Sequence, residues 1–222
     1  MEKPVHTTLP DNSYLIETFG WRPWDGARNI ALHLERMENS ASELGLDFPV
    51  AEAIGLIDEL TCETPLRCRM TLSQENGLEL TSNTLSGRTT DEWRLVLAAQ
   101  RVQSSNTLLR HKTSHRPQFD DARAALGTLG DEALFLNERD ELCEGTITNV
   151  FLDFGDGSFL TPALSCGLLP GVLRRVMLES GRAQEAVLYL SDLRSANKIF
   201  VGNSLRGLIP ARWIGDSLPV IP

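Results

Sequence analysis

The chain has 222 residues, of which 41% are hydrophobic and 23% are charged, and its formal net charge is −9. This composition is ordinary for a soluble globular protein, and the chain is long enough to bury a core as one large domain or two small lobes. The acidic balance argues against a surface for nucleic acid or for an anionic membrane, and no apolar run approaches the length of a membrane span.

The cysteines give no sign of a metal site. None forms a C-x-x-C pair, and no histidine lies at ligand spacing from them, so we expect no metal. Unpaired cysteines favour a reducing compartment, and the polar N-terminus lacks the apolar core of a signal peptide. We therefore expect a cytoplasmic protein with scattered free thiols, at Cys62, Cys68, Cys143 and Cys166.

Residues 1–99 are predicted to form a small α+β lobe, a sheet with two helices on it. A helix is expected over 30–45, because apolar side chains recur there at helical spacing and Gly45 can end it. A second helix is expected over 50–60. Strands are expected at 13–19, 66–73, 78–82 and 93–98, with a turn at Asn76-Gly77.

Two polar side chains of the first helix, His33 and Arg36, are three residues apart and therefore share a face. Arg36 lies beside the apolar stripe, where an arginine often covers the core with its stem. A planar, permanently charged guanidinium also suits a phosphate. The residues alone leave both interpretations of Arg36 open, and we expect His33 to be structural.

A polar stretch, 100–111, is expected to link the first lobe to a larger one. Lys112 follows it directly, and lysine otherwise occurs only at Lys3 and Lys198, whereas arginine is plentiful. Lysine can form a Schiff base once its pKa is lowered by burial or by nearby cations, and arginine cannot. Lys112 is therefore a candidate nucleophile, although a lysine here could also cap a strand. Lys198 is expected to flank a strand.

The larger C-terminal lobe, 112–222, is predicted to mix helices and strands. Its helices are expected at 119–129, 172–180 and 191–196, the last capped by Ser191. Its strands are expected at 131–137, 149–154, 158–162, 186–190 and 198–202, with Gly155-Asp156-Gly157 as the turn of a hairpin.

The central stretch, 142–174, begins with a carboxylate and ends at a glycine-bearing helix start. Glu144 stands directly before a glycine and a pair of threonines, and Pro170-Gly171 leads into the helix that begins at Val172. Such a helix start presents backbone N–H groups and a positive dipole end to an anion. A flat ligand with a ring nitrogen and a phosphate needs both features. A surface glutamate followed by a capped helix has the same spacing, so the spacing alone does not decide.

Three segments together resemble the fold-type IV pyridoxal-phosphate enzymes of the aminotransferase class IV family. They are H-x-x-R-x-x-x-S-A at 33–41, H-K-T-x-x-R at 111–116, and E-G-x-x-T-N-V-F at 144–151, followed by T-P and G-L-L-P-G-V-x-R. The lysine segment is most similar to that of aminodeoxychorismate lyases, in particular the lyase portion fused to aminodeoxychorismate synthase. Branched-chain transaminases continue differently after their lysine. The resemblance covers nearly the whole chain, 17–211.

The resemblance implies an α/β fold like that of D-amino-acid aminotransferase, with the cofactor between two lobes and usually a homodimer. Lys112 would hold pyridoxal 5'-phosphate as a Schiff base and then act as a base, while Glu144 would keep the pyridine nitrogen protonated. Thr18 would lie near the lysine, although a strand residue facing solvent would look the same. The cofactor contacts that it implies are Arg36, Lys112, Glu144, Thr148, Asn149, Leu169, Val172, Leu173 and Asn203.

The activity implied is that of a 4-amino-4-deoxychorismate lyase, which releases pyruvate and 4-aminobenzoate for folate biosynthesis. The alternatives are a class IV aminotransferase for branched-chain or D-amino acids, and a non-catalytic domain without cofactor. The expected partner is a small-molecule amine, not a nucleic acid or a membrane. Three departures from the family bear on these expectations. The chain begins almost at the Glu17-Thr18 strand, so leading strands would be missing or shortened, and Leu173 and Asn203 stand where many members carry threonine.

Overall fold

The computed structural model describes residues 9–87, 92–155, 157–217 and 220–221. Its contacts divide the chain into two compact units: 1–87 with 111–115, and 88–110 with 116–222. These boundaries lie elsewhere than the lobes expected at 1–99 and 112–222. The strand after residue 92 pairs within the second unit, and the lysine segment pairs within the first.

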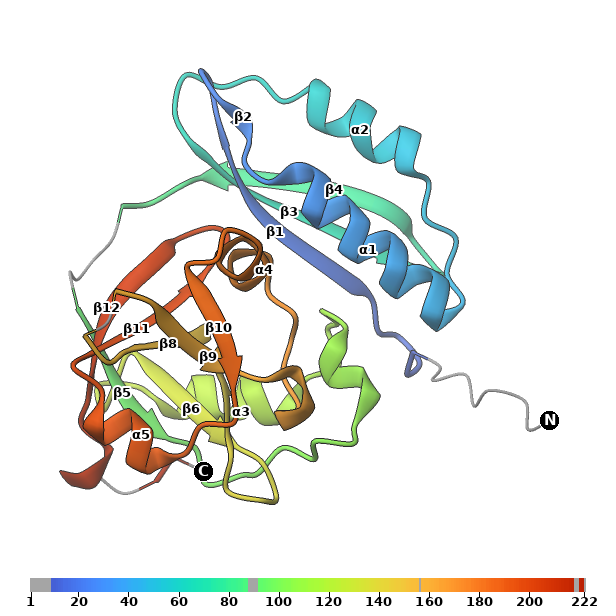
Figure 1. Cartoon of the computed structure of the whole chain (residues 1–222). Coiled ribbons are helices and arrows are strands. Elements are labelled where there is room, and N and C mark those ends of the chain that lie inside the picture. Colours follow the sequence, from blue (N-terminus) through green and yellow to red (C-terminus); the bar gives the residue numbers. More distant parts are fainter. Residues whose placement is uncertain (1–8, 88–91, 156, 218–219, 222) are drawn as a thin grey trace. The chain divides into compact units, whose positions relative to one another are not determined.

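The first unit is a four-stranded antiparallel sheet with two helices on one face (Figure 1). Helix α1 ends as predicted, because Gly45 adopts a left-handed φ of 75° and its N–H bonds the Ala41 carbonyl. The sheet has the order β2-β1-β3-β4, and the elements are β1 (Leu15–Arg22), β2 (Gly26–Ala27), α1 (Ile30–Leu44), α2 (Val50–Asp58), β3 (Leu66–Ser73) and β4 (Gly77–Thr84).

Strand alternation gives this sheet two different faces. One face packs against the helices and forms the core of the unit. The other face carries Ile16 and Thr18 of β1 and the paired Thr71 and Arg69 of β3. The buried apolar residues of the helix-covered face and its helices are Leu15, Phe19, Leu66, Cys68, Met70, Leu72, Met37, Ala41, Leu44, Ala53 and Ile57.

The lysine segment, 111–115, extends the same sheet as a short antiparallel partner of β1. The Ile16 N–H donates to the Lys112 carbonyl at 2.8 Å, and the Ser114 N–H donates to the Tyr14 carbonyl at 2.9 Å. Leu15 and Thr113 form the bridge between these bonds. The segment and β2 therefore pair with the same edge of β1. The segment lies at the end near Leu15, and β2 lies at the end near Arg22.

The second unit is built on an eight-stranded mixed sheet of order β10-β9-β8-β11-β12-β5-β6-β7. The pairs β10–β9, β12–β5 and β5–β6 are parallel and the others are antiparallel. The strands are β5 (Trp93–Leu97), β6 (Glu132–Leu136), β7 (Leu142–Gly145), β8 (Asn149–Asp153), β9 (Phe159–Pro162), β10 (Ala183–Ala186), β11 (Lys198–Asn203) and β12 (Gly207–Trp213); the helices are α3 (Pro117–Ala125), α4 (Val172–Glu179) and α5 (Leu190–Ser195), with single 3-10 turns at η1 (Thr107–Arg110), η2 (Leu164–Cys166) and η3 (Gly215–Ser217).

Both faces of this sheet are covered, which explains why β6 is buried along its whole length. Leu134 of β6 packs into a cluster with residues of β5, β8, β11 and β12, whereas Ala133 and Phe135 pack into a second cluster with Phe119 and Leu126, which lie in and directly after α3. A strand buried on both sides carries a continuous apolar run, and Glu132 at its start is therefore conspicuous.

The sequence predictions for 186–191 are wrong. The strand β10 ends at Ala186, and α5 begins at Leu190. Val187 and Tyr189 are exposed and Leu188 is buried in the core, so the segment has the alternating burial of a strand, but the pairing of β10 with β9 ends at Ala186. Tyr189, not Ser191, is the N-cap residue, and its N–H donates to the Asp192 carboxylate at 2.7 Å. Strand β12 was not predicted at all. Of the predicted hairpin turn 155–157, Asp156 lies outside the described residues.

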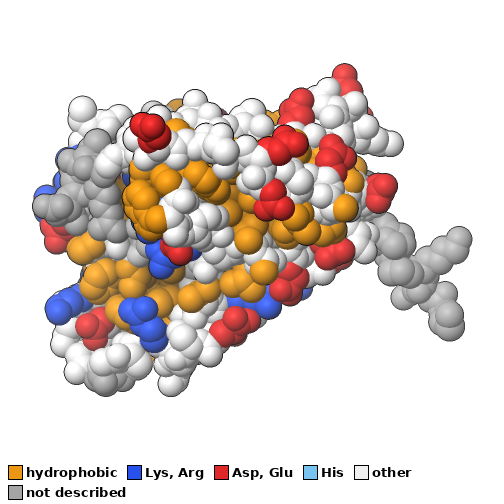
Figure 2. Space-filling model, turned by 90° about the horizontal axis from the view of Figure 1, so that it is seen from above, with side chains coloured by type: hydrophobic (Ala, Val, Ile, Leu, Met, Phe, Trp, Pro, Cys, Tyr) orange, Lys and Arg blue, Asp and Glu red, His pale blue; other side chains and the backbone are white. Residues whose placement is uncertain are grey.

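Acidic side chains are scattered over the face shown in Figure 2, in keeping with a net charge of −9. Within the ranges that the structure describes, no helix is both long enough and apolar enough to span a bilayer.

Candidate active site

Glu144 is a buried carboxylate near the end of β7, with only 8% of its surface exposed. Its Oε1 accepts the Leu169 N–H at 3.1 Å. Pairing within the sheet fixes the backbone at Glu144, because the next residue, Gly145, pairs with Leu134 of the buried strand β6. The candidate carboxylate is therefore fixed by backbone pairing, and it is tied to the loop that precedes α4.

Asn149 holds the other side of that loop. Its Nδ2 donates to the Leu169 carbonyl at 3.1 Å. Its Oδ1 lies so close to Gly171 that a Cβ at that position would overlap it. Gly171 has an ordinary φ of −64°, so glycine is required there by this approach and not by backbone conformation. One residue, Leu169, thus bonds Glu144 through its N–H and Asn149 through its carbonyl.

Helix α4 begins directly after Gly171 without a side-chain cap. The first N–H groups of a helix have no partner within it, so Val172 and Leu173 contribute donors to a positive dipole end. The Leu173 side chain packs into an apolar cluster, with its Cδ2 2.7 Å from the position that a Cβ on Gly202 would take. Leu173 can therefore offer an anion only its backbone.

Asn203 ends β11 beside this helix start. Its Nδ2 donates to the Ile147 carbonyl at 3.2 Å, and its Oδ1 accepts the Arg206 N–H at 3.0 Å. Strand β11 pairs with β8, with Gly202 opposite Asn149. The structure thus groups the predicted residues of the second unit at the ends of β7, β8 and β11 and at the start of α4: Glu144, Thr148, Asn149, Leu169, Val172, Leu173 and Asn203.

Sequence reasoning missed Glu132, the first residue of β6. The turn 145–148, between β7 and β8, folds around its side chain. This carboxylate is completely buried, and Oε2 accepts the Thr148 hydroxyl at 2.8 Å. The hydroxyl of Thr148 is thus engaged inside the protein, and any contact of Thr148 with a cofactor remains a prediction. One feature of the sequence could have identified Glu132: it is an acidic residue at the start of β6, which is otherwise apolar.

The first unit holds the other predicted residues, and it places Arg36 on a second buried carboxylate, Glu17. Arg36 Nε and Nη2 donate to the two oxygens of Glu17 at 2.8 and 2.7 Å. His33 Nδ1 lies 2.6 Å from Glu17 Oε2 and must donate, because an ionised carboxylate only accepts. These bonds use two of the five N–H donors of Arg36, and a contact of Arg36 with a phosphate stays a prediction.

The pKa of Glu17 reflects this environment. Burial would raise it, but the charge of Arg36 and the hydrogen bonds from His33 and Arg36 outweigh burial and lower the pKa to about 2. Glu17 is therefore ionised at neutral pH inside the protein. His33 is structural in this arrangement, in that it completes the shell of donors around Glu17.

Lys112 and Thr18 lie on the opposite face of the sheet from Glu17. The pairing of Lys112 with Ile16 puts its side chain on the face that also carries Thr18, where Lys112 is half-buried. Arg69 lies on this face as well, with its guanidinium 5.9 Å from the Tyr14 ring. Lys198, by contrast, is an exposed residue of β11.

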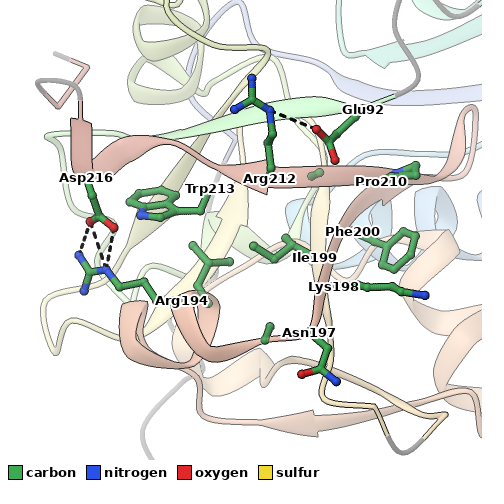
Figure 3. A pocket seen from close by; sticks show the side chains of 13 residues that line it. Glu92, Arg194, Asn197, Lys198, Ile199, Phe200, Pro210, Arg212, Trp213 and Asp216 are labelled. Atoms are coloured by element: carbon green, nitrogen blue, oxygen red, sulfur yellow. Dashed lines mark hydrogen bonds and ion pairs between the residues drawn. The ribbon is translucent and has the colours of Figure 1, made fainter.

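A pocket of about 600 Å³ between α5, β11 and β12 contains none of the predicted site residues (Figure 3). Lys198 lines it, and its arginines are paired. Arg194 bonds Asp216, and Arg212 Nε lies 3.1 Å from Glu92. Because both of its arginines are already paired with carboxylates, we assign no ligand to this pocket.

The residues of the second unit fit pyridoxal 5'-phosphate in their chemistry. A buried carboxylate, Glu144, suits a protonated ring nitrogen. The start of α4 has no side-chain cap, and its first N–H groups suit a phosphate. Both features belong to one hydrogen-bonded network through Leu169.

Comparison with known proteins supports the same family. The family model "Amino-transferase class IV" matches residues 14–214. A structure from Mesorhizobium loti, described as a "putative amino-acid aminotransferase", is 48% identical with a TM-score of 0.86, and the match covers 91% of this chain and 100% of that one.

Two relatives carry different names. A "Putative aminodeoxychorismate lyase" of Schizosaccharomyces pombe is 27% identical over 183 residues, which are 78% of this chain and 79% of that protein. A "Probable branched-chain-amino-acid aminotransferase" of Thermotoga maritima is 27% identical over 90 residues, so this match spans 38% of this chain and only 33% of that protein. Because the family model covers most of the chain, the chain belongs to the class IV aminotransferase family of pyridoxal-phosphate-dependent enzymes.

Proposed function

We propose that this enzyme is a 4-amino-4-deoxychorismate lyase, which splits its substrate into 4-aminobenzoate and pyruvate. The observation that carries the cofactor part of the proposal is the network around Leu169. It joins a buried carboxylate, Glu144, to the start of α4 through Asn149. Support for the lyase part comes from the H-K-T-x-x-R segment at Lys112 and from the yeast relative that matches over most of its length.

Each residue has a distinct task in this proposal. Pyridoxal phosphate, when bound, supplies an electron sink for the carbon that loses its proton. Lys112 would hold the cofactor through Nζ, and its amine would be the base that takes the proton from the ring carbon that bears the substrate amine. Glu144 holds the proton on the pyridine nitrogen. Arg36, the N–H groups of Val172 and Leu173, and Asn203 bind the phosphate.

The remaining assignments are minor. Thr18 shares the sheet face of Lys112 and would help to orient its amine. Thr148 and Leu169 shape the ring-nitrogen end of the site. We also propose that the enzyme works as a cytoplasmic homodimer, which light scattering of the purified protein will test. A monomer of full activity would contradict the dimer.

The second candidate function is an amino-acid aminotransferase, favoured by the 48% identity to the Mesorhizobium loti protein described in those words. The two activities differ in stoichiometry. A lyase converts its substrate without a second reactant, whereas an aminotransferase consumes one keto acid for each amine. This difference separates them without any assumption about the site.

The deciding experiment incubates the pyridoxal-phosphate-loaded protein with 4-amino-4-deoxychorismate in the absence of any keto acid. We expect 4-aminobenzoate and pyruvate in equal amounts. Turnover of amino acids that depends on added 2-oxoglutarate, with no 4-aminobenzoate formed, would show that the protein is an aminotransferase instead. The matched pair Glu144→Gln and Glu141→Gln tests the site. Glu141 is also largely buried but bonds Asn137 and Arg139, so its variant should keep the activity that Glu144→Gln loses.

A further inference from the structure

We propose that Glu132 is a positioning residue, which sets the orientation of Glu144 through the turn 145–148 that directly follows Glu144. The inference rests on the proposed function in one respect, the role of Glu144 at the cofactor ring. Glu132 touches neither the start of α4 nor Glu144 in any bond that the structure describes. Its effect on the site must therefore pass through the turn 145–148.

The turn 145–148 is folded around the Glu132 carboxylate. Oε1 accepts the Thr146 N–H at 3.0 Å and also the Thr146 hydroxyl. Oε2 accepts the Thr148 hydroxyl at 2.8 Å and the Ile147 N–H at 3.3 Å. Four donors from three consecutive residues thus converge on one side chain with no exposed surface.

Two basic side chains complete this arrangement. Arg123 Nη1 lies 3.5 Å from Glu132 Oε1 and balances its charge. Arg116, at the start of α3, donates to the Thr146 carbonyl. The turn is therefore held on its N–H side by a carboxylate and on its carbonyl side by a guanidinium, which leaves it little freedom to move.

Gly145 gives a second, independent observation. A Cβ at this position would lie 2.7 Å from Glu132 Cδ, 2.8 Å from its Cγ and 2.6 Å from the Thr148 hydroxyl oxygen. The Glu132 side chain therefore passes directly over the backbone of the residue that follows Glu144. Gly145 is needed because that space is taken, and a change at Glu132 acts on the backbone one residue from the candidate carboxylate.

The turn connects Glu132 to both sides of the site. Glu144 precedes the turn and bonds the Leu169 N–H, while Asn149 follows it and bonds the Leu169 carbonyl. Asn203 bonds the carbonyl of Ile147 inside the turn. A shift of the turn thus displaces the ring-nitrogen carboxylate and the loop before α4 together.

The charge of Glu132, and not only its volume, is what the turn requires. An ionised carboxylate is a pure acceptor, and every group that faces it is a donor. In Glu132→Gln the amide keeps the shape but turns its own N–H groups toward the donors of the turn. One oxygen then loses its bonds, and the turn must open to separate donor from donor.

The test compares Glu132→Gln with Glu141→Gln. Both replace a largely buried carboxylate of the second unit that accepts several hydrogen bonds, but Glu141 bonds Asn137 and Arg139 and does not touch the turn. The first readout is amide hydrogen exchange at Leu169, measured by NMR without cofactor. Leu169 makes no bond to Glu132, so its exchange reports whether the change is transmitted. We expect faster exchange at Leu169 in Glu132→Gln and wild-type exchange in Glu141→Gln.

The second readout is a pyridoxal-phosphate titration together with the pH profile of the absorbance of the bound cofactor. Glu132→Gln should weaken binding by about ten- to a hundredfold, the effect of about one lost bond to a charged group, and should shift the pH profile. Thr146→Val and Thr146→Ser provide a milder pair in case Glu132→Gln does not fold. Valine removes one donor to Glu132 and serine keeps it, so only valine should reproduce the effects.

Each outcome is decisive. Wild-type exchange at Leu169 in Glu132→Gln and Thr146→Val overturns the inference, whether or not the cofactor binds. Faster exchange at Leu169 with unchanged cofactor affinity and pH profile also overturns it, and leaves the proposed function standing. A wild-type protein that binds no pyridoxal phosphate refutes the proposed function, and the inference then fails with it. Faster exchange and weaker binding in both variants, with normal behaviour of both controls, supports the inference.

Discussion

Replacement of Glu17 by glutamine tests the buried ion cluster of the first unit, formed by Glu17, His33 and Arg36. The pKa of Glu17 is lowered from an ordinary 4.5 to about 2, a difference of about 2.5. At about 1.4 kcal/mol per pH unit, the ionised carboxylate contributes about 3 kcal/mol to the free energy of unfolding at pH 7. No discount for solvent applies, since Glu17 is 1% exposed.

The sign of the pH dependence follows from the lowered pKa. As the pH falls, the unfolded chain takes up a proton at Glu17 near pH 4.5, whereas the folded protein resists until about pH 2. The stabilisation is therefore complete above pH 4.5 and is lost between pH 4.5 and pH 2. Glutamine cannot ionise, so the stability gap between wild type and Glu17→Gln should shrink by about 2 kcal/mol from pH 7 to pH 3.

The assay is urea unfolding of both proteins at pH 7 and pH 3, with hydrogen exchange of α1 peptides to assign the change to the first unit. Glu79→Gln is the matched control, because it removes the same charge from an exposed position on β4. Its stability relative to wild type should not depend on pH in this way. A gap for Glu17→Gln that stays constant between the two pH values, as in the control, would refute the assignment of Glu17 as an ionised, paired carboxylate.

Three further predictions concern the cofactor. Borohydride reduction of the loaded protein followed by peptide mapping should find the cofactor on Lys112, and an adduct on Lys198 would contradict the assignment. Gly171→Ala should lower pyridoxal-phosphate affinity about tenfold in an absorbance titration. The new Cβ would displace the Asn149 amide, which bonds the Leu169 carbonyl in the loop before α4. Unchanged affinity would show that the close approach of Asn149 to Gly171 does not matter for cofactor binding. Leu173→Thr should bind the cofactor at least as tightly as wild type but melt at a lower temperature, because it gains a hydroxyl near the anion and loses apolar packing.

The sequence predicted well where structure depends on neighbours along the chain. The helix over 30–45 ends at Gly45 as expected, because the left-handed conformation that closes a helix is a local property of glycine. The strand over 66–73 has the predicted bounds. The residues grouped around Glu144 were also predicted, because a short hairpin and one loop carry nearly all of them.

What the sequence did not predict depends on contacts between distant segments. Glu17 and Arg36 are 19 residues apart, and Glu132 and Thr148 are 16 apart, so no local pattern pairs them. Strand β12 was missed because Pro210 interrupts its pattern. The parallel partner β5 pairs only from Ala211 onward, so the missing N–H of the proline faces no ladder on that side.

The five residues that return to the first unit have a consequence for the order in which the protein forms during synthesis. Tyr14 and Ile16 find their backbone partners in Ser114 and Lys112, about a hundred positions later in translation. A nascent chain that has emerged only to residue 87 has every other strand of this sheet, but the end of β1 near Leu15 lacks its partner on the edge shared with β2. Contacts so distant in sequence close late and slowly. The sheet of the first unit is therefore completed only after Lys112 has been synthesised. A chain that is truncated before Lys112 lacks both the proposed nucleophile and the last partner of this sheet.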